Sequence, residues 1–465
     1  MNRIRISGQH YRQLQKHLFP GDNKEAVAIA LCGRSIYGDN HTLLVQELLL
    51  IPYEECYERR GDFVHWPTAL INPLLERAAK HKLALIKIHC HPGYYEKFSW
   101  IDNESDFSLF TSINAWLDDE LPHASCIMLP EGRLFGRFFT ANMEEEIVHQ
   151  ISVAGSDILH WYYSPDRSID DEKQIRNLQA FGEKTIRMIN KLKIGVVGCS
   201  GTGSPVIEQL KRYAVGELVL VDPDFIDTLN LNRIISSTER DAKSKLLKVD
   251  VMKRGVKEVG YGTFVTTFPS HISTYSCVKE LAECDVLFGG VDGSEGRHIL
   301  NLISSHYIIP LLDLGVKLDA DGMGGINGIF GSVHYIQPGG SSLLSRGQYN
   351  LESLRAEAIK RSNKEEYARN QYLANVNESS PAVISINMQV AATAVNEFLA
   401  RIHPYRNINN SDIDIIRIMF GDCTSYGESF GQPCPFFSKL TGKGDINPLL
   451  NNPELSYVTK ADQMA

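Results

Sequence analysis

Two histidines and one aspartate stand close together in the first quarter of the chain. His89 and His91 are two residues apart, and Asp102 follows eleven residues after His91. Two imidazoles and one carboxylate are three ligands, which leave the fourth position of a tetrahedral zinc ion open to water. Zinc sites with an open position hydrolyse substrates, whereas sites closed by four protein ligands hold structure. The spacing therefore predicts a hydrolytic zinc centre.

The residues around this cluster predict the elements that position it. The apolar run 83–88 predicts a buried strand. Residues two apart on a strand point to one side, so both imidazoles would face the same way. Ser99 and Asp102 have the spacing of a capping box, which predicts a helix that runs to about Leu117. The alternative is structural: Ser99 and Asp102 only cap this helix, and the histidines are the polar end of a strand.

The order of these residues resembles the JAB/MPN zinc isopeptidases. The chain has His-x-His-Pro, then Ser99 after seven residues that follow the second histidine, and then Asp102. The resemblance covers roughly residues 1–150 and implies an α+β domain with a mixed sheet. It also implies that His89, His91 and Asp102 hold the zinc ion.

The same resemblance implies roles for two further side chains. Glu25 stands just ahead of an apolar run that ends in Cys-Gly. It would accept a proton from the attacking water and return it to the leaving amine. Ser99 would donate a hydrogen bond to the developing oxyanion. Two acids remain as alternatives: Glu47 as the base, and Asp106 as a ligand or a partner of the ligands.

The composition limits the classes of protein that fit. The chain has 465 residues, a net charge of −9 and nine cysteines without CxxC pairs. This length gives room for two or three domains. An acidic balance without a basic run makes nucleic acid an unexpected partner, and the scattered cysteines predict reduced thiols in the cytoplasm. We expect no membrane contact, because the sequence has neither a long apolar stretch nor a signal-peptide pattern.

The first domain boundary is predicted near residue 152. A helix predicted over 142–152 would close a JAB/MPN domain at 1–152. The polar stretch 164–171 contains Pro, Ser and Asp and is typical of an exposed connector. It would lie in a linker, 153–171.

The second domain is predicted at 172–420. It would begin with a helix to about residue 191 and end with a largely apolar helix, 381–401, and a strand, 414–420. A tail, 421–465, is rich in Gly, Pro and Asn. The fold class expected for the whole chain is α/β.

A glycine-rich turn follows an apolar strand at 193–197. Glycines there let the backbone approach a phosphate, and the helix that follows offers free N–H groups. The next predicted strand, 217–221, leads into Asp222, which suits a ribose hydroxyl. These features alone favour a nicotinamide or flavin Rossmann domain.

Charged and amide residues further along indicate a nucleoside triphosphate instead. Asn230 and Arg233 are followed by Lys245 and Lys248, and later by Asp292. Cations neutralise the phosphates, and an aspartate can hold the magnesium that bridges them. The ordered set resembles the ThiF/MoeB/ubiquitin-activating adenylyltransferases over roughly residues 172–420.

This second resemblance implies a mainly parallel, Rossmann-like sheet that uses ATP and magnesium to adenylate the C-terminal glycine of a ubiquitin-like protein. Asp292 would hold the magnesium, and Lys245 or Lys248 would be the family's lysine. Arg176 would reach the ATP of a partner subunit, which implies a homodimer through this domain. Arg233 and Lys248 would also act in catalysis. The implied nucleotide-binding residues are Arg176, Gly198, Gly201, Gly203, Asp222, Asn230, Arg233, Lys245, Lys248 and Asp292.

The cysteine that many activating enzymes use in a second step has no counterpart here. No cysteine lies between Cys284 and Cys423. Three alternatives remain: direct transfer of the adenylated tail, an oxyester on a serine of the run 338–347, or a thioester on Cys423 or Cys434. A serine nucleophile needs a base, and turn chemistry explains these serines equally well. The candidate serines are Ser341, Ser342 and Ser345.

Together, the two halves predict a bifunctional enzyme of a bacterial ubiquitin-like modification pathway. One half would adenylate the modifier, and the other would mature or remove it. The expected partners are a ubiquitin-like protein with a C-terminal glycine and a conjugating-enzyme-like protein. One alternative is activation and trimming of a sulfur-carrier protein for cofactor or cysteine synthesis. Another is a scaffold with two degraded domains, against which the intact metal and nucleotide residues weigh.

Overall fold

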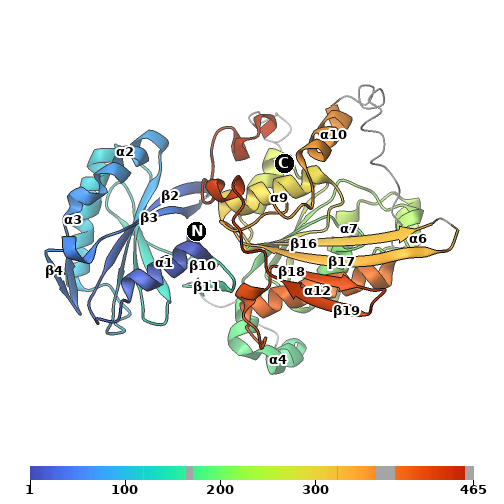
Figure 1. The fold of residues 1–465 in the computed structure, drawn as a ribbon, viewed down its shortest axis with the longest axis horizontal. Helices are drawn as coiled ribbons and strands as arrows, with labels where there is room; N and C mark the ends of the chain where they lie inside the picture. The colour runs from blue at the N-terminus through green and yellow to red at the C-terminus, as the bar shows by residue number, and fades with distance from the viewer. Residues whose placement is uncertain (119, 164–170, 322, 363–382, 456–465) are drawn as a thin grey trace. The chain divides into compact units, whose positions relative to one another are not determined.

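The computed structural model describes residues 1–118, 120–163, 171–321, 323–362 and 383–455 (Figure 1). These residues form two compact units. Unit 1 comprises Met1–Pro165 with His306–Ile308 and Leu440–Leu450, and unit 2 comprises the rest. None of the helices in these ranges combines the length and hydropathy that a membrane span requires.

Unit 1 is built on a nine-stranded mixed sheet with the order β11-β10-β1-β3-β2-β6-β7-β8-β9. Parallel pairs join β1 to β10, β1 to β3 and β6 to β7, and the other neighbours are antiparallel. A separate hairpin joins β4 (Glu58–Arg60) to β5 (Phe63–His65). The strands of the large sheet are β1 (Asn2–Ser7), β2 (Val27–Tyr37), β3 (Asn40–Leu50), β6 (Ala84–Cys90), β7 (His123–Met128), β8 (Leu134–Phe139), β9 (Glu145–Ile147), β10 (Gln150–Ala154) and β11 (Ile158–Tyr162).

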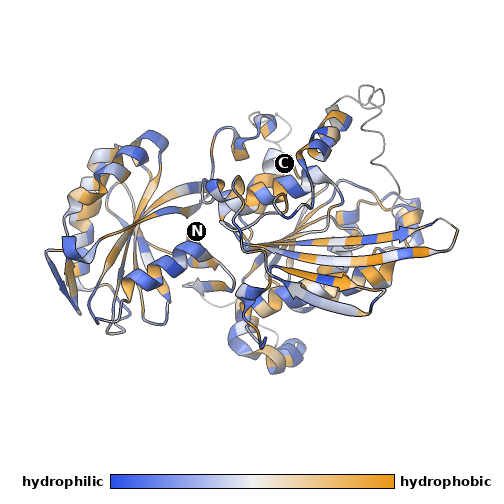
Figure 2. Ribbon diagram, viewed as in Figure 1, coloured by the Kyte–Doolittle hydropathy of each residue, from blue (hydrophilic) through white to orange (hydrophobic). Residues whose placement is uncertain are grey.

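Helices cover both faces of this sheet because its central strands are apolar on both sides. On β2, Ala28 and Ala30 pack into one core with α1 (Gly8–Leu18). Ile29 and Leu31 pack into a second core with α2 (Asn72–His81) and α3 (Trp100–Leu117). Figure 2 shows hydrophobic and hydrophilic residues mixed along α2 and α3. The pattern of α2 is typical of a helix with one buried face, whereas α3 also exposes Trp100, Phe107 and Trp116. The strand predicted at 83–88 and the capped helix after Ser99 are confirmed as β6 and α3.

The helix predicted over 142–152 is wrong. This stretch contains β9 and β10, and β10 pairs in parallel with β1 from the other end of the unit. The buried residues Val148, Ile151 and Val153 are β-branched and suit a sheet. The proposed boundary at residue 152 therefore falls inside β10, and the sheet of unit 1 continues to Tyr162. Most of the proposed connector, 164–170, lies outside the described residues.

Unit 2 is built on an eight-stranded sheet with the order β14-β13-β12-β15-β16-β17-β18-β19. The first five strands run parallel, and the pairs from β16 to β19 are antiparallel. The expected mainly parallel sheet is therefore a mixed one, because two hairpins extend it on one side. The strands are β12 (Lys193–Val197), β13 (Glu217–Val221), β14 (Phe264–Phe268), β15 (Val286–Gly289), β16 (Leu311–Ala320), β17 (Ile326–Ile336), β18 (Ile415–Met419) and β19 (Thr424–Glu428).

The helices of unit 2 connect and cover these strands. The predicted apolar helix is observed as α12, which packs on α5 and on β16 and β17, whereas residues 381 and 382 lie outside the described ranges. The helix predicted to start near residue 172 is α4, and it is broken at Gly182, where φ is +76°. The helices are α4 (Asp171–Ile189), α5 (Gly203–Arg212), α6 (Glu239–Lys243), α7 (Lys248–Val259), α8 (Tyr275–Ala282), α9 (Ser294–Tyr307), α10 (Leu351–Ser362) and α12 (Ile384–Ile402).

The proposed tail, 421–465, is not one independent segment. Its first part forms β19, the edge strand of the unit 2 sheet. Leu440–Leu450 belongs to unit 1, where the Asp445 N–H donates to the carbonyl of Arg34 at 2.7 Å. Residues 456–465 lie outside the described ranges.

Candidate functional site

The end of β6 holds the two histidines of unit 1. His89 lies between Val27 of β2 and Ile127 of β7 in the sheet, so its backbone is fixed on both sides. The next turn is anchored by the His91 N–H, which donates to the carbonyl of Met128 at 3.1 Å. Both side chains are buried, and their Nε2 atoms lie 3.2 Å apart.

Asp102 on the first turn of α3 completes the cluster. The Ser99 N–H donates to Asp102 Oδ2 at 2.7 Å, and the Asp102 N–H donates to Ser99 Oγ at 3.1 Å, so the capping box is fully formed. The same carboxylate lies 3.0 Å from His89 Nε2 through Oδ1 and 3.4 Å from His91 Nε2 through Oδ2. Asp102 thus caps the helix and also faces the histidines.

The three side chains are close enough to share a zinc ion. Ligands about 2.05 Å from a tetrahedral metal are about 3.3 Å from one another. Here the two Nε2 atoms are 3.2 Å apart, Asp102 Oδ1 lies 3.0 Å from His89 Nε2, and Oδ2 of the same carboxylate lies 3.4 Å from His91 Nε2. His91 Nδ1 donates to the carbonyl of Tyr95 at 2.7 Å, which leaves its Nε2 lone pair for a metal. Within the described ranges this is the one group of three or more His, Cys, Asp or Glu side chains close enough to share an ion.

The electrostatics also suit a cation. Burial lowers the pKa of His89, which favours the neutral imidazole that binds metal. Burial alone would raise the pKa of Asp102, but hydrogen bonds with His89 and His91 outweigh it and hold that pKa far below the usual range. Burial opposes the charged form of His91, yet the bonds to Asp102 and the Tyr95 carbonyl raise its pKa.

Glu25 is the acid nearest to this cluster that does not belong to it. It immediately precedes β2, its Oε1 lies 3.8 Å from His91 Nε2, and it is buried. Burial raises its pKa to about 7, although His91 opposes the shift. A carboxyl group with a pKa near neutrality can both take and return a proton. Glu47, the alternative base, instead pairs with Arg77 at 2.9 Å and is half exposed.

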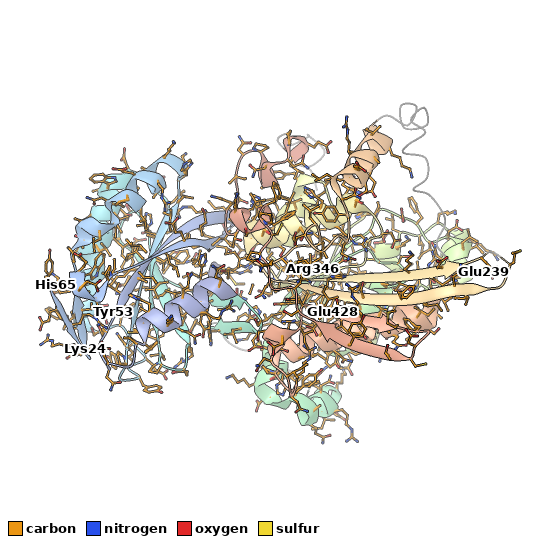
Figure 3. All side chains as sticks on the ribbon, viewed as in Figure 1. Lys24, Tyr53, His65, Glu239, Arg346 and Glu428 are labelled. Carbon is orange, nitrogen blue, oxygen red and sulfur yellow. The ribbon has the colours of Figure 1, made fainter. Side chains whose placement is uncertain are left out.

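A cavity of about 630 Å³ opens beside the cluster and is lined by Glu25, His89 and Asp102. One wall is α3, and another is the β4–β5 hairpin with the residues that follow it. His65, labelled at the end of β5 in Figure 3, belongs to this second wall. Aromatic and hydroxyl side chains share the lining: Tyr57, Phe63, Trp66, Ser105, Ser108, Ser112 and Trp116.

Asp106 is not a rival metal ligand. Its Oδ1 lies 2.6 Å from Lys87 Nζ, and its Oδ2 lies 2.8 Å from Arg137 Nη2. The carboxylate is fully buried between these two cations. Sequence spacing missed this cluster because Arg137 comes from β8, far along the chain.

The glycine turn of unit 2 is compact. It leaves β12 at Gly198, where φ is +90°, and enters α5 at Gly203. A Cβ on Gly203 would lie 1.7 Å from the carbonyl oxygen of Gly198, and a Cβ on Gly201 would lie 2.4 Å from Asn387 Nδ2. Only glycine fits both positions, so the backbone itself forms this surface.

A cavity of about 730 Å³ lies over this turn. Most of the predicted nucleotide-binding residues line it, whereas Gly201 and Gly203 shape the turn. Arg176 is exposed on α4, where it donates to Gln179 at 3.0 Å, and does not line the cavity. The predicted residues that do line it are Gly198, Asp222, Asn230, Arg233, Lys245, Lys248 and Asp292.

The two candidate lysines differ in their surroundings. Lys248, the first residue of α7, is buried, and its Nζ lies 2.7 Å from Asp224 and 3.6 Å from Asp222. Lys245 is exposed and pairs with Asp227 at 2.8 Å. Burial raises the pKa of Asp222, and Lys248 opposes that shift. The Asp222 carboxylate also accepts the Cys199 N–H at 2.8 Å, so it braces the turn.

The cavity of unit 2 includes acids that the sequence did not reveal. Glu357 of α10 accepts the N–H groups of Ser294 and Glu295 at 2.9 and 2.8 Å, and so caps the start of α9 next to Asp292. This contact joins residues more than sixty positions apart, and no local spacing signals it.

The three candidate serines lie in a tight turn. Ser341 Oγ accepts from Arg346 Nε at 3.0 Å and Nη2 at 2.8 Å, and Arg346 is labelled in Figure 3. The Ser342 N–H donates to Ser345 Oγ at 2.9 Å. None of the three lines the cavity over the glycine turn, and their bonds within the turn suit a structural role.

Known proteins resemble unit 2 in sequence. Residues 172–420 match the sequence model of the ThiF family. The adenylyltransferase and sulfurtransferase UBA4 of Meyerozyma guilliermondii is 27% identical over 134 residues, which are 28% of this chain and 31% of that protein. Ubiquitin-like modifier-activating enzyme 5 of Culex quinquefasciatus is 24% identical over 169 residues, 34% of this chain and 40% of that protein.

Two further matches are one sequence relative and one solved structure. The probable molybdopterin-synthase adenylyltransferase of Porphyra purpurea is 29% identical over 105 residues, 23% of this chain and 27% of that protein. The chain thus spans well under half the length of these three relatives. A crystal structure of MccB from E. coli with ATP has a TM-score of 0.42 at 19% identity, and the match covers 57% of this chain and 74% of that one.

Proposed function

The chain belongs to the ThiF family through residues 172–420, and we propose that unit 2 uses ATP and magnesium to adenylate the C-terminal glycine of a ubiquitin-like protein. One observation carries the proposal: the glycine turn, the buried Lys248 and Asp292 surround one cavity. The backbone at Gly198 and the start of α5 would receive the phosphates. Arg233 and Lys248 would neutralise them, and Asp292 would hold the magnesium.

We propose that unit 1 is a zinc isopeptidase. The closeness of three side chains, whose ligand atoms all lie within 4.8 Å of one another, supports this, together with an acid of raised pKa beside them. Zinc, when bound, would polarise the scissile carbonyl and lower the pKa of the attacking water. Glu25 would take the proton of that water and give it to the leaving amine. Ser99, whose Oγ accepts the Asp102 N–H at the start of α3, would donate its hydroxyl proton to the oxyanion.

The two activities would act on the same modifier. An adenylated glycine tail gives an amide or ester to an acceptor, and a peptidase that cuts after glycine reverses or precedes that step. The proposed partners are a ubiquitin-like protein, a conjugating-enzyme-like protein and a second copy of the chain. In that dimer, Arg176, exposed on α4, would reach the partner's ATP. An acyl-enzyme on Ser341, Ser342 or Ser345 would require the turn to open, because its hydroxyls are already bonded.

The second candidate function is activation of a sulfur-carrier protein. It is favoured by the names of two relatives, one an adenylyltransferase and sulfurtransferase and the other a molybdopterin-synthase adenylyltransferase. Unit 1 would then trim the carrier tail. Mass spectrometry of the carrier after incubation with ATP, a sulfur donor and this protein distinguishes the two candidate functions, since only sulfur-carrier activation yields a thiocarboxylate.

The decisive experiment measures both activities in one protein. ATP–pyrophosphate exchange with a ubiquitin-like protein that ends in glycine reports unit 2, and cleavage of a tail-extended form of the same protein reports unit 1. We expect Asp292→Ala to abolish exchange and spare cleavage, and Glu25→Ala to do the reverse. Exchange in the absence of any ubiquitin-like protein, or its loss in both variants, would contradict the proposal.

A further inference from the structure

Unit 1 joins β6 to α3 through two neighbouring pairs of side chains. Lys87 and His89 are two apart on the strand, so they face the helix together. Asp102 and Asp106 are four apart on the helix, so they face the strand together. One pair joins His89 Nε2 to Asp102 Oδ1 at 3.0 Å, and the other joins Lys87 Nζ to Asp106 Oδ1 at 2.6 Å. The first pair belongs to the proposed metal site, and the second needs no metal.

The second pair extends to a third element. Arg137 of β8 binds Asp106 through Nη2 at 2.8 Å, and its Nη1 donates to Asn103 Oδ1 at 2.7 Å. Asn103 is the residue next to Asp102. The side chains of Lys87, Asp106 and Arg137 are 5%, 0% and 8% exposed, so this cluster is shielded from water. Strong bonds in a buried site fix distance and direction more tightly than surface pairs do.

We propose that Lys87, Asp106 and Arg137 form a positioning cluster that sets the place of α3 along the sheet. The cluster holds Asp102 at binding distance from His89 and His91 before metal arrives. A buried ion cluster adds little to stability compared with apolar side chains, so its place here is better explained by geometry. The proposal rests on the proposed zinc function of unit 1 and adds three residues that are not metal ligands, of which Lys87 also lines the cavity.

The test compares zinc affinities of the full chain by competition with a chromophoric chelator. Asp106→Asn removes the central charge at constant shape, and Lys87→Met removes one cation. We expect both to weaken zinc binding, by roughly 10- to 100-fold as for other residues that orient metal ligands. If the variants acted through charge alone, Asp106→Asn would weaken zinc binding and Lys87→Met would strengthen it, because loss of a nearby cation strengthens the binding of another cation. Tighter zinc binding by Lys87→Met would therefore overturn the proposal.

Two further measurements separate positioning from general stability. Leu14→Ala opens a void in the core on the other face of the same sheet, and we expect it to lower the melting temperature without changing zinc affinity. Cobalt in place of zinc should give the strong visible absorption of a four-coordinate ion in the wild type and a weaker spectrum in Asp106→Asn. If Asp106→Asn does not fold, Arg137→Gln at the edge of the cluster replaces it, with the same loss expected.

The outcomes distinguish the two proposals. A wild-type chain that binds no zinc would remove the zinc function itself. A wild type that binds zinc, together with cluster variants of unchanged affinity and spectrum, would remove only the positioning role. A double variant, Lys87→Met with Asp106→Asn, should lose no more affinity than the worse single variant, because both act through one contact.

Discussion

The cavities of the two units are built from different parts of the chain. In unit 1, side chains from the end of β6 and from α3 converge until ligand atoms lie 3.0 to 3.4 Å apart, and Glu25, ahead of β2, lies 3.8 Å from His91. In unit 2, backbone at a glycine turn forms one surface, and charged side chains stand around a wider space. The first arrangement suits an ion about 2 Å from each ligand, and the second suits a ligand that carries its own charges.

The difference appears in the electrostatics as well. Burial or close partners shift the pKa of Glu25, His89, His91 and Asp102 in unit 1. In unit 2, burial raises the pKa of Asp222 as well, but both Asp222 and Glu357 are held in place by hydrogen bonds from backbone N–H groups. A convergent site depends on each single side chain, whereas a distributed site spreads its binding over many groups. A single substitution at the cavity should therefore reduce activity more in unit 1 than in unit 2.

The largest effect is expected for Glu25→Gln. The amide keeps the shape of the side chain but cannot accept the proton of the attacking water, so cleavage should fall roughly 10²- to 10⁴-fold. Bound zinc, measured by mass spectrometry of the metal, should remain. Glu47→Gln is the matched control, because this glutamate pairs with Arg77 away from the cavity. Full activity in Glu25→Gln with loss in Glu47→Gln would reverse the assignment.

The second-largest effect is expected for Lys248 of unit 2, and Lys245 serves for comparison. Lys248→Met removes a buried cation that faces the cavity, and we expect exchange to fall roughly 10²- to 10³-fold, as when a transition-state donor is removed. Lys245→Met removes an exposed cation paired with Asp227, and we expect a loss of about fivefold or less. Steady-state exchange at several ATP concentrations checks both. Equal losses would mean that Lys245 moves into the cavity when ATP binds.

Local patterns predicted the parts of each site that are local. The paired histidines, the capping box and the glycine turn each lie within about fifteen residues, and each is where its spacing indicates. The missed parts are pairings between distant segments. β10 forms because β1 lies beside it, and the roles of Arg137 and Glu357 depend on partners more than thirty positions away. Tertiary contact overrides local propensity at such positions.

A smaller effect is expected from the buried imidazole of His123. Burial, helped by Arg34, lowers its pKa from 6.5 to about 3. A base with a lowered pKa stabilises the fold fully above pH 6.5, and this contribution is lost as the pH falls toward 3. Between pH 7 and pH 5 this contribution to the free energy of unfolding falls by about 2 kcal/mol. Hydrogen exchange of the β7 amides in the full chain measures it.

His123→Gln should make that pH dependence shallower, since glutamine can accept the Leu85 N–H that His123 Nδ1 accepts at 3.0 Å. His65→Gln, at an exposed position, is the control. A steep dependence that persists in His123→Gln would assign the acid sensitivity of β7 to other groups.

The smallest expected effect separates two roles of Ser99, as a cap of α3 and as a donor to the oxyanion. Ser99→Ala removes both and should cost about 1 kcal/mol of unfolding free energy. Ser99→Asn restores the cap, because its side-chain oxygen can accept the Asp102 N–H. Recovery of stability without recovery of cleavage would mean that the hydroxyl acts on the substrate. Recovery of both would mean that Ser99 acts only by holding Asp102, and the convergent site would then contain one catalytic side chain fewer than its sequence suggests.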